Sequence, residues 1–162
     1  MLNHRTATII AEQIGHPYDV IPLEQLREQH FGIFQDTTAA ERKGALGELF
    51  ARMKADPTVA PVLADGDAGE SMHVFQERVI TAMSELAASH IGETVLVVGH
   101  GGVLSAFFKH VLQLPLCTPR KFAVDNAGIG EMTWRPGKGW WVETWNSTRH
   151  LEDIGYVGFH HD

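Results

Sequence analysis

The feature that constrains the fold most is a short apolar run that leads directly into a glycine-rich turn and a helical pattern. Residues 94–98 read Thr-Val-Leu-Val-Val, a β-branched run typical of a strand buried on both faces of a parallel sheet. Gly-His-Gly-Gly follows at residues 99–102, and residues 103–112 then have helical apolar spacing. A strand, a tight turn and a helix in this order predict an α/β domain with a mostly parallel sheet.

Helices and strands alternate along the rest of the chain. Apolar periodicity predicts helices over residues 6–14, 38–53 and 71–86. Thr38 and Glu41 form a capping box for the second helix, and Ser71 is placed to cap the third. Short extended runs are predicted at residues 19–23, 122–124, 129–134 and 140–145, the last two joined as a hairpin. The Pro- and Gly-containing stretch 56–69 is interpreted as a functional loop, so residues 1–162 are expected to form a single domain.

The composition is that of an ordinary globular protein with an acidic surface. The formal net charge of −7 disfavours nucleic acid as a partner, because such a surface repels phosphate backbones. Apolar stretches are far shorter than the roughly 20 residues that cross a bilayer, so a membrane location is excluded. Cys117 is the only cysteine, which favours a reducing, cytoplasmic compartment. The ten histidines form no HExxH motif or tight cluster, so no metal site is predicted.

The turn at residues 99–102 is a candidate anion site. It lies where a strand ends and a helix begins, and free N–H groups and the helix dipole at such a place favour a negative charge. His100 would lie in the crevice at the carboxyl end of the sheet, where ligands of open α/β sheets bind. The alternative is a structural turn in which the glycines only pack and His100 is a solvated cap.

A second candidate is Glu28, in the loop segment Leu-Arg-Glu-Gln-His-Phe-Gly over residues 26–32. General acid catalysis needs a carboxyl group whose pKa is raised toward the working pH, and a neighbouring phosphate has that effect. The alternative is a surface ion pair between Glu28 and Arg27 or Arg42.

Several ordered blocks together carry a family resemblance. Thr-Ala-x-Ile-Ile-Ala opens the chain, Leu-x-Glu-x-x-Phe-Gly and Gly-Glu-Ser follow, and Val-Leu-Val-Val-x-His-Gly-Gly-Val comes after them. Asn126 and a terminal group of Trp140, Asn146, His150 and Leu151 complete the order. The chain resembles the histidine phosphatase superfamily, in its phosphoglycerate-mutase-like branch. The resemblance implies a three-layer α/β sandwich with a mostly parallel sheet, and phosphoryl transfer or hydrolysis of small phosphomonoesters without a cofactor.

The resemblance also implies roles for individual residues. His100 would be the second active-site histidine, which contacts the transferred phosphoryl group, and Glu28 the proton donor to the leaving group. The phosphate- and substrate-binding residues would be Gly101, Gly102, Asn126 and Glu70. For Glu70, capping of the following helix is an equal alternative. Arg78 in that helix is interpreted as a surface residue rather than a pocket cation.

The chain departs from the family pattern at its beginning. Family members open with a strand that ends in Arg-His-Gly, whose histidine becomes phosphorylated, and no Arg-His-Gly occurs in the 162 residues. A phosphate-clamping arginine of the family falls on Leu2, and His4 and Arg5 are not expected to substitute. The sheet would then lack its first strand, and the chain is expected to be inactive or nearly so, because the covalent route needs its nucleophile.

Three explanations follow for the expected missing strand: a truncated gene or misplaced start codon, which is favoured, a strand recruited from another copy, or a rearranged sheet. A non-catalytic phosphate-binding or homo-oligomeric pseudophosphatase is the alternative function. The partner expected in either case is phosphate or a small phosphorylated metabolite, and a broad or small-metabolite phosphatase is favoured over a mutase.

Overall fold

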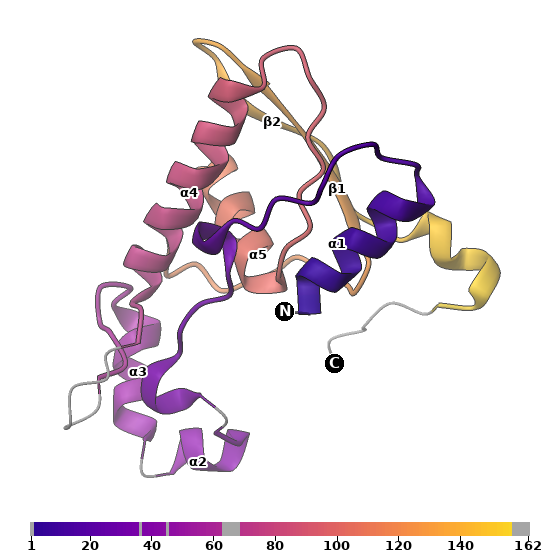
Figure 1. The fold of residues 1–162 in the computed structure, drawn as a ribbon. Coiled ribbons are helices and arrows are strands. Elements are labelled where there is room, and N and C mark those ends of the chain that lie inside the picture. Colours follow the sequence, from indigo (N-terminus) through magenta and orange to yellow (C-terminus); the bar gives the residue numbers. More distant parts are fainter. Residues whose placement is uncertain (1, 36, 45, 63–68, 157–162) are drawn as a thin grey trace.

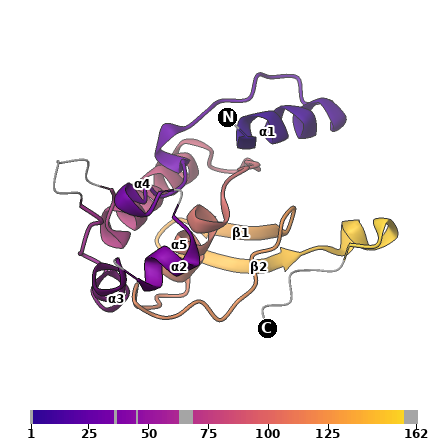
Figure 2. The ribbon, with the colours of Figure 1, turned by 90° about the horizontal axis from the view of Figure 1, so that it is seen from below.

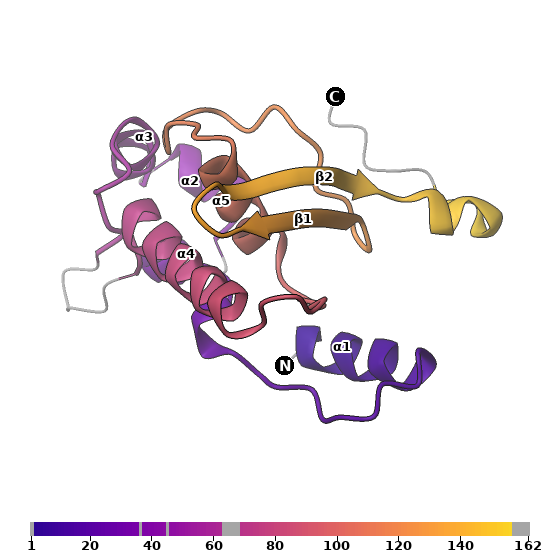
Figure 3. The same cartoon turned by 90° about the horizontal axis from the view of Figure 1, so that it is seen from above.

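The computed structural model describes residues 2–35, 37–44, 46–62 and 69–156 (Figure 1). The α-helices are α1 (Leu2–Gln13), α2 (Ala39–Lys43), α3 (Gly47–Ala55), α4 (Met72–Ser89) and α5 (Gly101–Val111). The strands are β1 (Ile129–Arg135) and β2 (Gly139–Ser147). Three short 3-10 helices are η1 (Glu24–Leu26), η2 (Gly32–Phe34) and η3 (Arg149–Ile154). Helices α4 and α5 form the centre, the β-hairpin lies against α5, and α2 and α3 lie near the N-terminal end of α4 (Figures 1 and 3).

The core lies between α4 and α5. Its buried members are Leu26, Phe75, Val79, Ala82, Val103, Ala106 and Phe107. The α4 residues among them have the spacing expected for one helix face, so the predicted amphipathic helix is confirmed. Ser71 caps α4 as predicted, because its Oγ accepts a 3.2 Å hydrogen bond from the Val74 N–H. Burial of a side chain such as Phe75, Val79 or Val103 stabilises the folded state by about 1.5–3 kcal/mol.

A buried polar contact also joins the two central helices. Gln76 of α4 is buried, and its Nε2 donates to the Ala106 carbonyl of α5 at 2.9 Å. Because the Ala106 carbonyl lies within α5, the hydrogen bond from Gln76 restricts how α4 can shift along the axis of α5, as well as the distance between the two helices. The anion turn at the start of α5 therefore has a fixed place relative to α4.

The predicted hairpin is confirmed. β1 and β2 pair antiparallel, with Trp134 opposite Trp140, and Gly137 and Gly139 take positive φ values in the connecting turn. Trp140 packs edge-on against Phe107 of α5, with ring centroids 4.9 Å apart. Trp145 likewise stacks on Phe108 of α5, so aromatic side chains of the hairpin pack against this helix, beside which the hairpin lies in Figure 3.

The predicted buried strand at residues 94–98 is absent. The only sheet in the described part of the chain is the β1–β2 hairpin, so no parallel sheet is seen there. Leu96 is 63% exposed and Val95 42%, whereas Val97 packs against the core. A strand exists only through ladder hydrogen bonds to a neighbour, and no described segment supplies them here. Residues 94–98 connect α4 to α5, but they do not pair with another strand as predicted.

Other predictions are corrected in detail. The helix predicted over residues 38–53 is divided into α2 and α3 at Gly44, although the capping box of Thr38 and Glu41 is present. Residues 19–23 and 122–124 are not in strands. The first helix is found as α1, which begins earlier than predicted and stands apart from α4 and the hairpin (Figure 2). In the predicted loop at 56–69, residues 63–68 lie outside the described residues.

Candidate functional site

The N-terminus of α5 is formed by the glycine-rich turn. His100 is the N-cap residue, with extended backbone angles of φ −88° and ψ 157°, and its carbonyl accepts the first helical hydrogen bond from Leu104 at 3.0 Å. The N–H groups that follow it have no carbonyl partner within the helix, which is the condition for binding an anion. At Gly101 a β-carbon would lie 3.6 Å from Cγ1 of Val124, so the segment before Asn126 passes beside this turn.

The carboxylate of Glu28 lies against this helix terminus. Its Oε2 accepts a hydrogen bond from the Gly102 N–H at 3.1 Å, and its Oε1 accepts one from the Gln29 N–H at 2.9 Å. A β-carbon at residue 102 would overlap the carboxylate, so only glycine permits this approach. Two predicted site residues that are 74 positions apart in the sequence are thus in direct contact. These partners are backbone groups, not Arg27 or Arg42, whose side chains interact with Glu24 and Thr37.

The loop that carries Glu28 is joined to the segment before α4. The His30 carbonyl accepts from the Glu70 N–H at 2.7 Å, and the His30 N–H donates to Glu70 Oε2 at 2.9 Å. Gln29 is buried, and its Nε2 donates to the Glu70 carbonyl at 2.9 Å. Gly32 and Gly69 face each other where these two segments meet, and a β-carbon on either would collide with the backbone of the other. The Gly-Glu-Ser block therefore supports the Glu28 loop.

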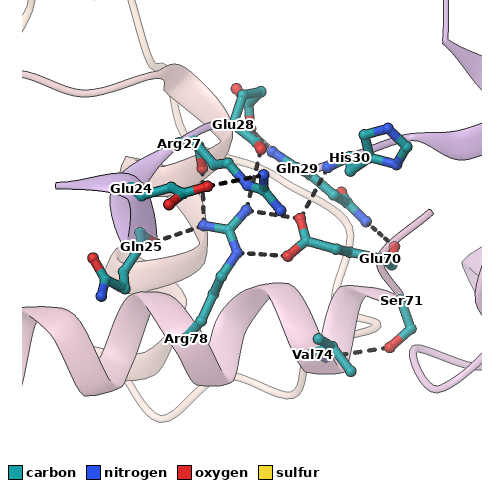
Figure 4. Close-up of polar contacts among 10 residues, drawn as sticks. All are labelled: Glu24, Gln25, Arg27, Glu28, Gln29, His30, Glu70, Ser71, Val74 and Arg78. Atoms are coloured by element: carbon teal, nitrogen blue, oxygen red, sulfur yellow. Dashed lines mark hydrogen bonds and ion pairs between the residues drawn. The ribbon is translucent and has the colours of Figure 1, made fainter. Parts of the chain in front are cut away.

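Arg78 of α4 connects these pieces. Its Nε and Nη2 bind the two carboxylate oxygens of Glu70 at 2.5 and 2.7 Å. Its Nη1 donates to the carbonyls of Gln25 and Arg27 at 2.7 and 3.0 Å, and Nη2 also donates to the Glu28 carbonyl at 3.1 Å (Figure 4). The Arg78 guanidinium lowers the pKa of the Glu70 carboxyl below its ordinary value, and the His30 N–H acts in the same direction.

Arg78 is therefore not the surface residue that the sequence suggested, because its side chain is 18% exposed. One signal in the sequence points to a buried role: Arg78 follows Phe75 by three positions and so borders the apolar face of α4. Its guanidinium lies over the Phe75 ring, 4.9 Å from the centroid. The carbonyls that it binds come from 50 to 53 positions away, which no local pattern could reveal.

Asn126 lies in an exposed turn over residues 125–128. Asn146 of β2 holds this turn, because its Oδ1 accepts from the Asp125 N–H at 2.7 Å and its Nδ2 donates to Asp125 Oδ2 at 2.8 Å. Asn146 has a positive φ of 52°, a backbone conformation that asparagine tolerates better than most residues. Asn126 follows Val124 by two positions in the sequence, and it is Val124 that lies beside Gly101. The sequence indicates Asn146 only as part of a terminal block, without this role.

No group of three or more His, Cys, Asp or Glu side chains within the described residues is arranged to hold a metal ion. Among the helices in the same part of the chain, none is long and apolar enough to cross a bilayer.

Comparison with known proteins identifies the family. The model of the histidine phosphatase superfamily (branch 1) matches residues 3–148, and the chain belongs to this superfamily. It is 28% identical to phosphoglycerate mutase-like protein 4 of Arabidopsis thaliana and 29% identical to the metal-independent phosphoserine phosphatase of the same plant. The matches cover 94% of this chain in both cases, but only 63% and 60% of those relatives' lengths.

Solved structures agree on the fold. Bacillus stearothermophilus YhfR superposes with a TM-score of 0.73 over 91% of this chain and 70% of its own, at 24% identity. A second structure, mycobacterial hydrolase 1, has a TM-score of 0.67 and 27% identity over 90% of this chain and 72% of its own. The described helices and hairpin therefore have a histidine phosphatase fold, although the parallel sheet expected for it is not seen in these residues.

Proposed function

We propose that this chain, as one domain, binds small phosphomonoesters at the N-terminus of α5 and supplies the proton donor for their cleavage. Phosphate oxygens would accept hydrogen bonds from the N–H groups of Gly101 and Gly102 and contact His100 and Asn126. Glu28 would protonate the leaving oxygen as its bond to phosphorus breaks, and the phosphoryl group would pass to a nucleophile. A phosphate that takes the Gly102 N–H would displace the Glu28 carboxylate, and its negative charge would favour the protonated, donating form of that group.

One observation carries this proposal: Glu28 Oε2 accepts a hydrogen bond from Gly102 at the helix terminus. An acid group and an anion-binding backbone are thereby within hydrogen-bond reach of each other, which is the geometric requirement for protonating a phosphoester oxygen. The names of two relatives, a phosphoserine phosphatase and a phosphoglycerate mutase-like protein, support small phosphorylated metabolites as the substrate class. The lone, exposed Cys117 supports a reducing, cytoplasmic compartment.

We further propose that the 162 residues alone turn over slowly. They contain no Arg-His-Gly, the tripeptide that supplies the phosphorylated histidine in the family, and we infer from this that the covalent route lacks its usual nucleophile within these residues. This observation favours a second candidate, a phosphate-binding protein without turnover, because the anion-binding turn at α5 does not depend on that tripeptide.

The test is hydrolysis of p-nitrophenyl phosphate by the purified chain at several pH values, with a size-exclusion profile of the same sample. If the chain also hydrolyses an alkyl phosphate, whose leaving oxygen needs a proton, Glu28→Gln should lower that rate by about 10²-fold or more, whereas Glu24→Gln, an exposed acid of the same loop, should not. Equal alkyl phosphate rates for the three proteins would refute the role of Glu28. His100→Ala should also slow the reaction, since a contact to the phosphoryl group is removed.

Binding is measured separately. Inorganic phosphate or vanadate should raise the melting temperature of the folded chain, because a ligand that binds only the native state stabilises it. A shift without hydrolysis supports the non-catalytic candidate, and no shift from either anion contradicts both candidates. The size-exclusion profile decides whether the chain is a monomer or a homo-oligomer.

A further inference from the structure

Among the interactions around the candidate site, the contacts of Arg78 are the most extensive. One guanidinium binds both oxygens of Glu70 and the carbonyls of Gln25, Arg27 and Glu28 (Figure 4). All of its donating nitrogens are therefore used, and three of the bonds go to the backbone of the loop that carries the proposed acid.

The rigidity of Arg78 comes from the core. Its guanidinium lies over the ring of Phe75, which is 1% exposed, and it projects from α4, whose next residue, Val79, is fully buried. Glu70 binds the same guanidinium through two hydrogen bonds, from Nε and Nη2, a geometry that lysine cannot reproduce.

The loop itself has little other regular structure. η1 is a single 3-10 turn, and residues 27–31 belong to no helix or strand. Carbonyl groups that point together toward one place need a common donor, and here that donor is Arg78. Its bond to the Glu28 carbonyl acts on the same residue whose side chain reaches the Gly102 N–H.

We propose that Arg78 is a positioning residue that, together with Glu70, holds the Glu28 carboxylate at the N-terminus of α5. Arg78 acts through the loop backbone and does not itself touch the phosphate site. Glu70 has the same indirect role, because its two oxygens are occupied by Arg78 and the His30 N–H. The catalytic consequence rests on the proposed function of Glu28, but the positioning itself does not.

The first experiment needs no turnover and uses the 162-residue chain as it is. The Gly102 amide proton is hydrogen-bonded to Glu28, so its NMR shift should follow the protonation of that carboxyl group as the pH changes. Glu28→Gln removes the carboxyl group, so loss of the response in this variant assigns it to Glu28. In Arg78→Lys the amplitude of the response should fall to about half or less, because a hydrogen bond weakens steeply when its geometry is disturbed.

Two further variants make the experiment decisive. Glu70→Gln removes the charged partner of Arg78 but leaves the Arg78 side chain, which can still bind the loop carbonyls. A smaller reduction of the Gly102 response is therefore expected than in Arg78→Lys. Arg27→Gln changes an exposed side chain of the same loop and should leave the response unchanged. If the NMR spectrum of Arg78→Lys is not that of a folded protein, the Gly102 response of Glu70→Gln tests the proposal instead. A full Gly102 response in the folded variants would overturn the proposal.

A kinetic experiment tests the consequence for catalysis. A general acid matters most for a poor leaving group, so an alkyl phosphate should be slowed by Arg78→Lys by about tenfold or more relative to a nitrophenyl phosphate. Glu28→Gln should show the same selective loss, whereas a merely destabilised protein would be slowed equally on both substrates. Equal slowing together with an altered Gly102 response would reject Glu28 as the acid but retain the positioning by Arg78.

Discussion

Two parts of this molecule contrast in how their segments are held. Around α4 and α5, buried side chains such as Phe75 and Val79 pack on both helices, and Arg78 ties a distant loop to them. In the run at 94–96 and in α1, large apolar side chains such as Leu96 and Ile9 are exposed by 63% and 50%. The first part is held by contacts between segments far apart in the sequence, whereas Leu96 and Ile9 in the second part are not buried by such contacts.

The difference shows what a sequence pattern determines. An apolar helix face and a capping residue act between neighbours three or four positions apart, so α4 forms wherever its face finds a partner. An apolar strand has no such local support, because its hydrogen bonds all belong to another segment. The comparison therefore predicts that substitutions in the two parts differ sharply in their cost.

The largest difference is expected between Phe75→Ala and Leu96→Ala. Removing the Phe75 ring leaves a cavity between α4 and α5 and should lower the free energy of unfolding by about 3–5 kcal/mol. Leu96 is exposed, so its change should stay within about 0.5 kcal/mol. Urea unfolding followed by circular dichroism measures both. A loss above about 2 kcal/mol for Leu96→Ala would mean that residues 94–96 are packed in solution. The proposed difference between the two parts of the molecule would then be wrong.

The next largest effect is expected when the Arg78 guanidinium is removed. Arg78→Met keeps the length of the side chain but leaves the Glu70 carboxylate, only 13% exposed, without its partner. A fully buried pair would cost about 3–5 kcal/mol to break, and the partial exposure here reduces the expected loss to about 2–3 kcal/mol. Arg27→Met removes only an exposed pair with Glu24 and should cost less than about 0.5 kcal/mol. Similar urea midpoints for the two variants would show that the contacts of the Arg78 guanidinium are not important for stability.

A smaller effect is expected in acid. Arg78 lowers the pKa of the Glu70 carboxyl from its ordinary value of 4.5, so in the acid range the unfolded chain binds the proton more tightly than the native state. The stabilisation is therefore complete above about pH 5.5 and is lost as the pH falls through the native pKa, below 4.5. Glu70→Gln lacks this group, so the stability difference between the parent and the variant should shrink below pH 4.5. A constant difference from pH 7 to pH 3 would contradict the assignment.

The features that the sequence predicts correctly are those that depend on local contacts. The Ser71 cap, the apolar face of α4 and the glycine turn of the hairpin each involve a few neighbouring residues, and each was found as predicted. The family was recognised from the order of short blocks, and the family match confirms it. The roles of Glu28 and His100 remain predictions, although the structure brings Glu28 into contact with the turn that follows His100.

The errors have a common physical origin. The side chains of residues 94–98 predict a buried strand, but the sheet that would bury them requires hydrogen-bond partners elsewhere. The sequence predicts a surface position for Arg78 because charged residues are mostly exposed, but the burial of Arg78 is compensated by Glu70 and by carbonyls of a distant loop. Both depend on contacts at long sequence separation, which a pattern of neighbours does not contain.

The smallest expected effect separates the caps of two helices. Ser71→Ala removes the bond to the Val74 N–H at the start of α4, and because α4 carries the core, the loss of about 1 kcal/mol should appear in global unfolding. Thr38→Ala removes an equivalent bond to Glu41 from α2, a five-residue helix at the periphery. Its loss should open α2 locally, which is detected as faster amide exchange in α2, with little change in the urea midpoint. Equal shifts of the midpoint would show that α2 unfolds together with α4 and α5, and the stability of the molecule would then be shared evenly instead of residing mainly in the two central helices.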